Sequence, residues 1–179
     1  MNMIIPNTNM KVCLTAMALI ACLSTGCLSQ TDTAHKHTEA YIRQRIDTIY
    51  KGVGQAAYEY EGRDSAYCSQ RYYTLMQHAG QLCIQTDDIL YDYDHWICGQ
   101  DWSDDWSYTI DTVYNITDTT ALADLTIHNF GDSKTTIALL FERDDWYIDD
   151  FSPSPDGNDD KQYLRQTILQ CQEILGKGQ

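Results

Sequence analysis

Basic residues are scarce in this chain of 179 residues, which has 12 Lys and Arg against 26 Asp and Glu. The resulting formal net charge of −14 repels phosphate backbones and anionic lipid headgroups. The composition therefore disfavours DNA, RNA and charged lipid surfaces, and we expect no nucleic acid among the partners. The same charge also serves ordinary solubility.

Phenylalanine is rare as well, with 3 Phe beside 13 Tyr and 4 Trp, so most aromatic side chains are amphipathic. Such rings suit a half-hydrated pocket or a partner surface, and Tyr is also favoured on ordinary sheet faces. The sequence shows no catalytic or cofactor motif, and no two cysteines have the close spacing of a zinc site. We therefore expect no cofactor and no metal, and assign no catalytic residue.

The apolar run Val12–Leu23 is too short to remain in a bilayer as a span. Lys11 precedes it and Ser24-Thr25-Gly26-Cys27 follows it, which predicts a secretory signal peptide over residues 1–26. The small residues before Cys27 resemble a lipobox, the bacterial signal for attaching acyl chains such as palmitate to that cysteine. An ordinary signal peptide with a chance cysteine is the alternative.

Lipid on Cys27 would anchor the chain to a membrane without spanning it. Leu28, where some lipoproteins have Asp, resembles the sorting of Gram-negative lipoproteins to the outer membrane. The expected location is therefore the Gram-negative cell envelope, with residues 27–37 as a flexible tether and residues 38–179 as a single domain.

The strongest periodic pattern lies between Trp106 and Phe151. From Trp106 to Ile116 every second residue is large or β-branched and the others are polar, with Val113 as the exception. Three further stretches follow after short turns, over residues 121–127, 135–141 and 146–148. Because parallel strands need long crossovers, these short connections predict a four-stranded antiparallel meander.

Apolar residues at helical spacing flank this region. Thr38 to Tyr60 is a predicted helix, with an apolar stripe of Ile42, Ile46, Ile49 and Val53. After a break at Glu61-Gly62-Arg63, Asp64 or Ser65 is the predicted N-cap of a second helix. Its shared face consists of Tyr72, Leu75, Met76, Ala79 and Leu82.

Beyond a linker containing Pro153 and Pro155, Asp159-Asp160 begin a last helix, where acids suit the positive end of the helix dipole. Its apolar stripe consists of Leu164, Ile168, Cys171 and Leu175. The predicted fold class is α+β: N-terminal helices packed on a curved four-stranded antiparallel meander, followed by a C-terminal helix.

Residues 87–105 form the longest aromatic and acidic stretch, and they show no clear period. The candidate residues for binding a ligand or partner are Asp92, Asp94, His95, Trp96, Gln100, Asp101 and Trp102. The acids match no calcium-binding loop, and a solvated acidic loop is the alternative.

The segments Asp92–Trp96, Gly99–Trp102 and Glu142–Phe151 together resemble the bacterial domain of unknown function 3828 family. This family consists of lipoproteins and periplasmic proteins of the nuclear-transport-factor-2-like (cystatin-like) superfamily. The resemblance implies a cone-shaped fold, in which a long helix lies across a strongly curved sheet, and an envelope location. It brings no established activity and no catalytic residues.

Four cysteines follow Cys27 in the predicted mature chain: Cys68, Cys83, Cys98 and Cys171. On one continuous helix the first two would lie about 22 Å apart, which is beyond disulfide reach. The pairings that stay open are Cys83–Cys98 with Cys68–Cys171, or Cys68–Cys98 with Cys83–Cys171. The alternative is four small buried side chains.

Two functional interpretations stay open. One is a non-enzymatic, lipid-anchored envelope protein whose aromatic-acidic pocket or rim binds a small molecule, a glycan or an envelope protein. The other is a small isomerase, dehydratase or hydrolase that uses Asp101 with His95 or His128, since superfamily members include isomerases and dehydratases with Asp and His in the cone. Partial burial of Asp101 among tryptophans would raise its pKa toward the range of an acid–base catalyst.

Overall fold

The computed structural model describes residues 34–55, 60–152 and 159–177. Residues 1–36 and 37–179 form two separate units, and the description below concerns the second unit. The predicted signal peptide, Cys27 and most of the tether lie outside the described residues. Within the described ranges, no helix has the length and apolar character needed to cross a bilayer.

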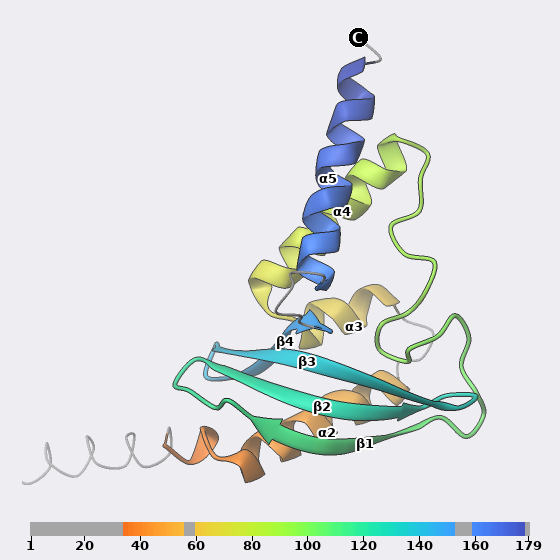
Figure 1. Ribbon diagram of the computed structural model, residues 1–179. Helices are drawn as coiled ribbons and strands as arrows, with labels where there is room; N and C mark the ends of the chain where they lie inside the picture. Colours follow the sequence, from red (N-terminus) through yellow and green to blue (C-terminus); the bar gives the residue numbers. More distant parts are fainter. Residues whose placement is uncertain (1–33, 56–59, 153–158, 178–179) are drawn as a thin grey trace, which may run out of the picture. The chain divides into compact units, whose positions relative to one another are not determined.

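The second unit places helices before and after a four-stranded sheet, which confirms the α+β class (Figure 1). The elements in order are α2 (Glu39–Gln55), α3 (Tyr60–Tyr67), α4 (Gln70–Gln85), β1 (Ser107–Tyr114), β2 (Thr120–His128), β3 (Asp132–Glu142), β4 (Asp145–Phe151) and α5 (Asp160–Lys177). All neighbouring strands pair antiparallel in the order β1-β2-β3-β4. The meander is therefore confirmed, and β1 and β4 are its edges.

Helix α2 packs against one face of the sheet. Its predicted apolar stripe is fully buried, at 0% exposure for Ile42, Ile46, Ile49 and Val53. Arg43 donates to the carbonyl of Ile110 on β1 (2.9 Å), and Arg45 donates to the carbonyl of Trp146 on β4 (3.0 Å). Since β1 and β4 are opposite edges, side chains from a single turn of α2 reach both edges of the sheet.

Strand β1 departs from strict alternation. Its pairing with β2 shifts between Ile110 and Thr112, so Asp111 is a bulged residue. Beyond the bulge Val113 is buried and Thr112 is exposed, the reverse of the predicted alternation. One extra residue exchanges the two faces of a strand, which explains why Val113 stood out from the pattern.

Two predictions about the second helix are wrong. Glu61-Gly62-Arg63 lies within α3, and the N-cap of α4 is Ser69, whose hydroxyl accepts the backbone N–H of Tyr72 (3.2 Å). The Ser69 N–H bonds the carbonyl of Ile148 on β4 (2.7 Å), so a long-range contact decides where this helix begins.

Helices α4 and α5 lie side by side above the β4 edge (Figure 1). At their N-terminal ends the Tyr72 hydroxyl donates to Asp160 (2.5 Å), and further along the sulfurs of Cys83 and Cys171 lie 4.0 Å apart. These two contacts are separated by eleven residues on both helices, or about three turns. The helices therefore run parallel and in register.

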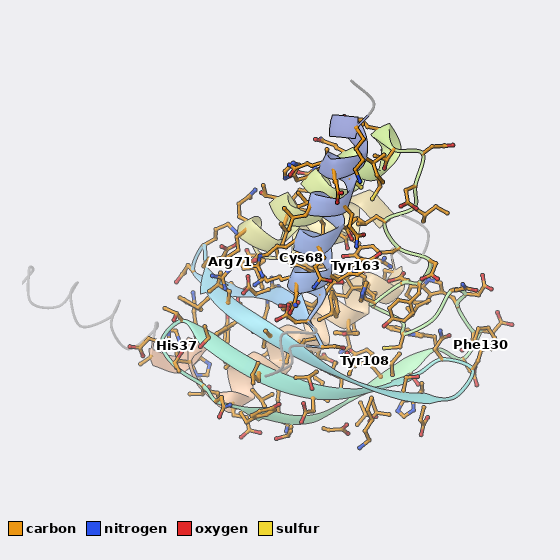
Figure 2. All side chains as sticks on the ribbon, turned by 45° about the horizontal axis from the view of Figure 1, so that its top comes forward. His37, Cys68, Arg71, Tyr108, Phe130 and Tyr163 are labelled. Carbon is orange, nitrogen blue, oxygen red and sulfur yellow. The ribbon has the colours of Figure 1, made fainter. Side chains whose placement is uncertain are left out.

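The two ends of the sheet have different surroundings. Figure 2 shows Phe130 at the tip of the β2–β3 turn and His37 at the opposite end. Phe130 is 76% exposed, whereas the His37 ring packs 4.4 Å from Phe141 and 5.5 Å from Trp146. Cys68 and Arg71 lie where α4 meets β4 (Figure 2).

Candidate functional site

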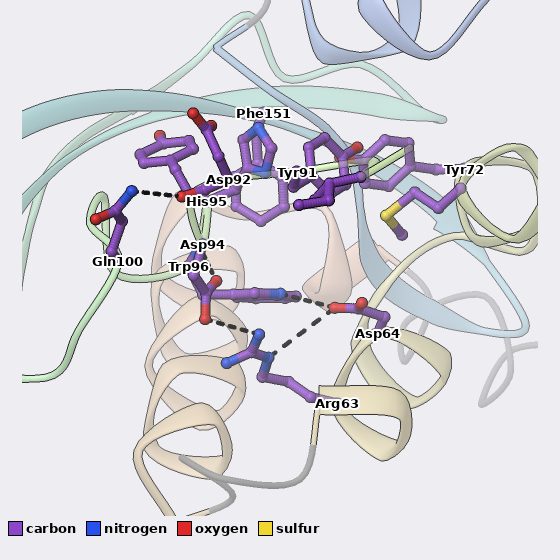
Figure 3. Close-up of a pocket in the computed structure, with 13 residues that line it drawn as sticks. Arg63, Asp64, Tyr72, Tyr91, Asp92, Asp94, His95, Trp96, Gln100 and Phe151 are labelled. Atoms are coloured by element: carbon purple, nitrogen blue, oxygen red, sulfur yellow. Dashed lines mark hydrogen bonds and ion pairs between the residues drawn. The ribbon is translucent and has the colours of Figure 1, made fainter. Parts of the chain in front are cut away.

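A cavity of about 500 Å³ lies between α3, α4, the segment after α4 and the end of β4 (Figure 3). Its aromatic lining consists of Tyr72, Tyr91, Tyr93, Trp96 and Phe151. Its polar lining consists of Arg63, Asp64, Asp92, Asp94, His95 and Gln100. Five of the residues proposed from the sequence, Asp92, Asp94, His95, Trp96 and Gln100, therefore line one cavity.

A small closed loop positions the central side chains of this lining. The Asp94 N–H donates to the carbonyl of Gly99 (2.8 Å), and the Gly99 N–H donates back to the Asp94 carbonyl (3.3 Å). The Asp94 carboxylate also accepts the N–H of Trp96 (2.9 Å), as aspartates often do two residues ahead in a turn. His95 and Trp96 are thus held on a short, internally bonded loop.

Asn129 fastens the next part of the loop to the β2–β3 turn. Its amide N–H group donates to the carbonyls of Ile97 (3.1 Å) and Asp101 (2.9 Å), and its carbonyl oxygen accepts the N–H of Ser103 (2.8 Å). A Cβ on Gly99 would lie 2.8 Å from the Asn129 amide nitrogen, so glycine permits this close approach. The side chain of Asn129, in the β2–β3 turn, therefore holds the loop over residues 97–103 in place.

Trp96 is fixed on one face by Arg63, as Figure 3 shows. Arg63 is 3% exposed, lies 5.6 Å from the Trp96 ring centre and forms an ion pair with Asp94 (2.9 Å). The Trp96 indole N–H donates to Asp64 (2.8 Å). Burial raises the pKa of Asp64 despite that hydrogen bond.

His95 and Asp160 form the central polar contact. The His95 Nε2 lies 3.0 Å from Asp160 Oδ1, and the other carboxylate oxygen accepts the hydroxyls of Tyr72 (2.5 Å) and Tyr91 (2.7 Å). Tyr91 and Tyr93 stand edge-on to the His95 ring, with centroids 4.5 Å and 4.9 Å away. The imidazole is therefore held between two phenols by a carboxylate on α5.

The environment keeps Asp160 ionised. Burial acts to raise its pKa, but the hydrogen bond and charge of His95, together with the two tyrosine hydroxyls, hold the pKa below its ordinary value. Burial raises the pKa values of Tyr72 and Tyr91, so both phenols stay protonated donors. An ionised acceptor requires that Nε2 of His95 carries a proton.

The second ring nitrogen of His95, Nδ1, makes no hydrogen bond with the described residues, and the side chain is 19% exposed. In the neutral ring this atom is a hydrogen-bond acceptor directed by the Asp160 contact. The arrangement can therefore accept a proton or a hydrogen bond from a molecule in the cavity.

Asp101 and Trp102 do not line this cavity, so their proposed part in binding a ligand or partner stays a prediction. Asp101 is exposed, and its carboxylate makes no hydrogen bond with the described residues, whereas its backbone carbonyl accepts the Asn129 amide. Trp102 packs on Trp106, with ring centroids 4.8 Å apart. The His128 ring forms hydrogen bonds with Thr109 and Asp132, and not with Asp101, which was its proposed catalytic partner.

Two more acids lie behind the site, at the end of β4. Asp149 is the bulged residue in the β3–β4 pairing, and its carboxylate accepts hydrogen bonds from Ser69 (2.6 Å), Arg71 and Lys161 (2.5 Å). Burial acts to raise its pKa, but these donors hold the pKa below its ordinary value. Asp149 thereby ties the N-terminal ends of α4 and α5 to the sheet.

Asp150 has a different environment. It is 5% exposed, and its carboxylate accepts the backbone N–H of Lys161 (3.2 Å). Burial, reinforced by the nearby charge of Asp159, raises the pKa of Asp150 to about 7.

Sequence reasoning missed Asp160, Arg63, Asp64 and the tyrosines around His95. Asp160 was assigned only as a first-turn acid of the last helix, which it is. Its contact with His95 joins residues far apart in the chain, and no local pattern reports such a contact. Among the described residues, no group of three or more His, Cys, Asp or Glu side chains is arranged to hold a metal ion.

No protein-family model, curated protein or solved structure matches this chain. The inference of function therefore depends on the cavity and on the leader sequence.

Proposed function

We propose that this chain is a non-enzymatic, lipid-anchored binding protein of the Gram-negative envelope. The observation that carries the proposal is the cavity lined by His95, whose Nε2 is held by Asp160 and whose Nδ1 has no hydrogen-bond partner among the described residues. A concave, mostly aromatic site with a few placed polar groups is typical of small-molecule recognition. The hydroxyls of Tyr72 and Tyr91 are both bonded to Asp160 and are not free to act on a substrate, which favours binding over turnover.

The lining indicates the class of ligand. It contains the carboxylates of Asp64, Asp92 and Asp94 against the single guanidinium of Arg63. Aromatic faces and carboxylates together attract organic cations, and Nδ1 of neutral His95 accepts a hydrogen bond. We propose a small organic amine, or the amine group of a glycan or an envelope protein, as the bound group.

Calorimetric titration of the full chain with tyramine tests the site, with methyl glucoside as a neutral probe and acetate as an anionic one. We expect tyramine to bind and His95→Ala to weaken binding at least tenfold. His78→Ala is the matched control, because His78 is an exposed histidine on α4 outside the cavity. Equal binding by His95→Ala and the unchanged protein would contradict the proposed site.

The membrane anchor is proposed from the leader sequence. Expression in a Gram-negative host with an alkyne-tagged palmitate should label the chain and place it in the outer-membrane fraction. Cys27→Ser should lose both the label and the membrane fraction, whereas Cys98→Ser should keep them. A labelled Cys27→Ser protein would disprove the anchor at this residue.

The resemblance to the domain of unknown function 3828 family supports the same location. We propose that the sheet and α2 form the nuclear-transport-factor-2-like cone of that superfamily. The packing of α2 on one face of the four-stranded meander supports this assignment. An experimental structure whose sheet is flat rather than strongly curved would contradict it.

The second candidate is a small isomerase or dehydratase, with Asp160 in the role first considered for Asp101. It is favoured by the His95–Asp160 contact, since a carboxylate that binds Nε2–H orients the opposite nitrogen as a general base. Such an enzyme exchanges a substrate C–H proton with solvent. Incubation with an envelope metabolite extract in heavy water should then give a deuterated product that His95→Ala fails to produce.

A further inference from the structure

Two cysteine sulfurs meet between α4 and α5. Sγ of Cys83 lies 4.0 Å from Sγ of Cys171, and the Thr86 hydroxyl lies 3.5 Å from the latter sulfur. The two residues are 1% and 2% exposed. A disulfide bond is about 2.05 Å long, so the sulfurs are in contact but not bonded.

Other cysteines of the described region lack such a contact. Cys68 pairs through its backbone with Ile148, and Cys98 directs its sulfur toward the carbonyl of His95 (3.8 Å). Of the four cysteines that the structure describes, Cys83 and Cys171 are the two whose sulfurs are in contact.

We propose that Cys83 and Cys171 form a disulfide bond that fastens α4 to α5, and that the thiol pair seen here is its reduced state. The helices present these residues to one another because they run parallel and in register from the Tyr72–Asp160 contact. Each cysteine is buried in the face that its helix turns toward the other.

The position of Cys83 and Cys171 on α4 and α5 shows how a disulfide bond would add to the contacts between these helices. The N-terminal ends of both helices are already tied to the sheet, because Arg71 and Lys161 both bind Asp149. Farther along the two helices, apolar side chains are exposed to water: Ile84 on α4 is 79% exposed, and Ile174 on α5 is 54% exposed. A covalent bond between Cys83 and Cys171 would therefore join the helices about three turns beyond these N-terminal contacts.

The reaction is thiol–disulfide exchange with a disulfide donor, either an oxidising protein disulfide or oxidised glutathione. The thiolate of one cysteine attacks the donor, forms a mixed disulfide and releases one donor thiolate. The second cysteine then attacks the mixed disulfide and releases the other. Two electrons pass to the donor, and its two thiolates take up the two cysteine protons. An envelope location would permit such a bond.

Burial controls when the exchange can occur. Burial, together with the contact with Cys171, raises the pKa of the Cys83 thiol to about 11. The reactive thiolate is then rare in the folded protein at neutral pH, and bulky donors cannot reach it. Oxidation should therefore accompany folding, before α4 and α5 close over the sulfurs.

The experiment refolds the reduced full chain from guanidinium chloride in a mixture of oxidised and reduced glutathione. Free thiols are then alkylated, and the protein is digested without reductant for mass spectrometry. We expect a cross-linked peptide pair joining Cys83 to Cys171, with Cys68 and Cys98 alkylated. The oxidised protein should melt about 10 °C above the same protein in dithiothreitol, because the bond closes a long loop of the unfolded chain.

Matched variants separate the bond from simple packing. Cys171→Ser should lose both the cross-link and the rise in melting temperature, whereas Cys98→Ser should keep both. Alkylated Cys83 and Cys171 in refolded, folded protein would overturn the proposal, as would cross-links from either residue to Cys68 or Cys98. If Cys171→Ser does not fold, the peptide map of the unchanged chain decides the question alone.

Discussion

Asp150→Asn should stabilise the protein at alkaline pH. Burial raises the pKa of Asp150 to about 7, against an ordinary value of 3.8. At pH values between these two pKa values, Asp150 is protonated in the folded state and ionised in the unfolded chain. The free energy of unfolding therefore falls as the pH rises from about 4 to about 7, and it remains at the lower value above about pH 7. The full difference corresponds to about 4 kcal/mol. Asparagine is neutral throughout and can still accept the Lys161 N–H.

Urea unfolding followed by tryptophan fluorescence at about pH 4.5 and about pH 8 measures this effect. The gain from Asp150→Asn should be about 3 kcal/mol larger at the higher pH. The neighbouring Asp149→Asn is the control, because donors hold the pKa of Asp149 below its ordinary value. It should destabilise the protein at both pH values. An Asp150→Asn gain that does not change with pH would refute the reasoning.

Three further substitutions test the scaffold of the site. Asn129→Ala removes three loop contacts and should cost about 2–3 kcal/mol, with faster hydrogen exchange over residues 97–103 as the specific sign. Arg63→Met leaves Asp94 without its ion-pair partner and should cost about 3–5 kcal/mol, much of which Asp94→Asn should restore in the double variant. Ile46→Ala should cost about 2–5 kcal/mol in urea unfolding, whereas the exposed Ile84→Ala should change stability by less than about 0.5 kcal/mol.

The sheet and α2 could be predicted because their signals are local and repeated. The stripe from Ile42 to Val53 has helical spacing, and the strands alternate between large and polar residues. The faces of β1 could not all be predicted, because the bulge at Asp111 reverses the alternation without a residue type that marks it. The start of α4 was missed for a similar reason, since the contact of Ser69 with β4 selects that cap.

The lining of the cavity could be predicted in part, through its composition. Aromatic and acidic residues gather between Asp87 and Asp105, and that concentration indicated His95 and its neighbours. Nothing local distinguished Asp92, which lines the cavity, from Asp101, whose backbone carbonyl is bound by Asn129 and which does not line it. Asp160 could not be linked to His95, because only the packing of α5 beside α4 brings them together.

The loop between α4 and β1 carries most of the cavity lining yet contributes no strand to the sheet. Asn129 and the Arg63–Asp94 pair attach it to the rest of the fold, and neither contact involves the side chain of Ile89 or Asp92. Substitutions at those two positions can therefore alter what the cavity accepts while these attachments stay intact. Evolution of a new preference would not require a new architecture.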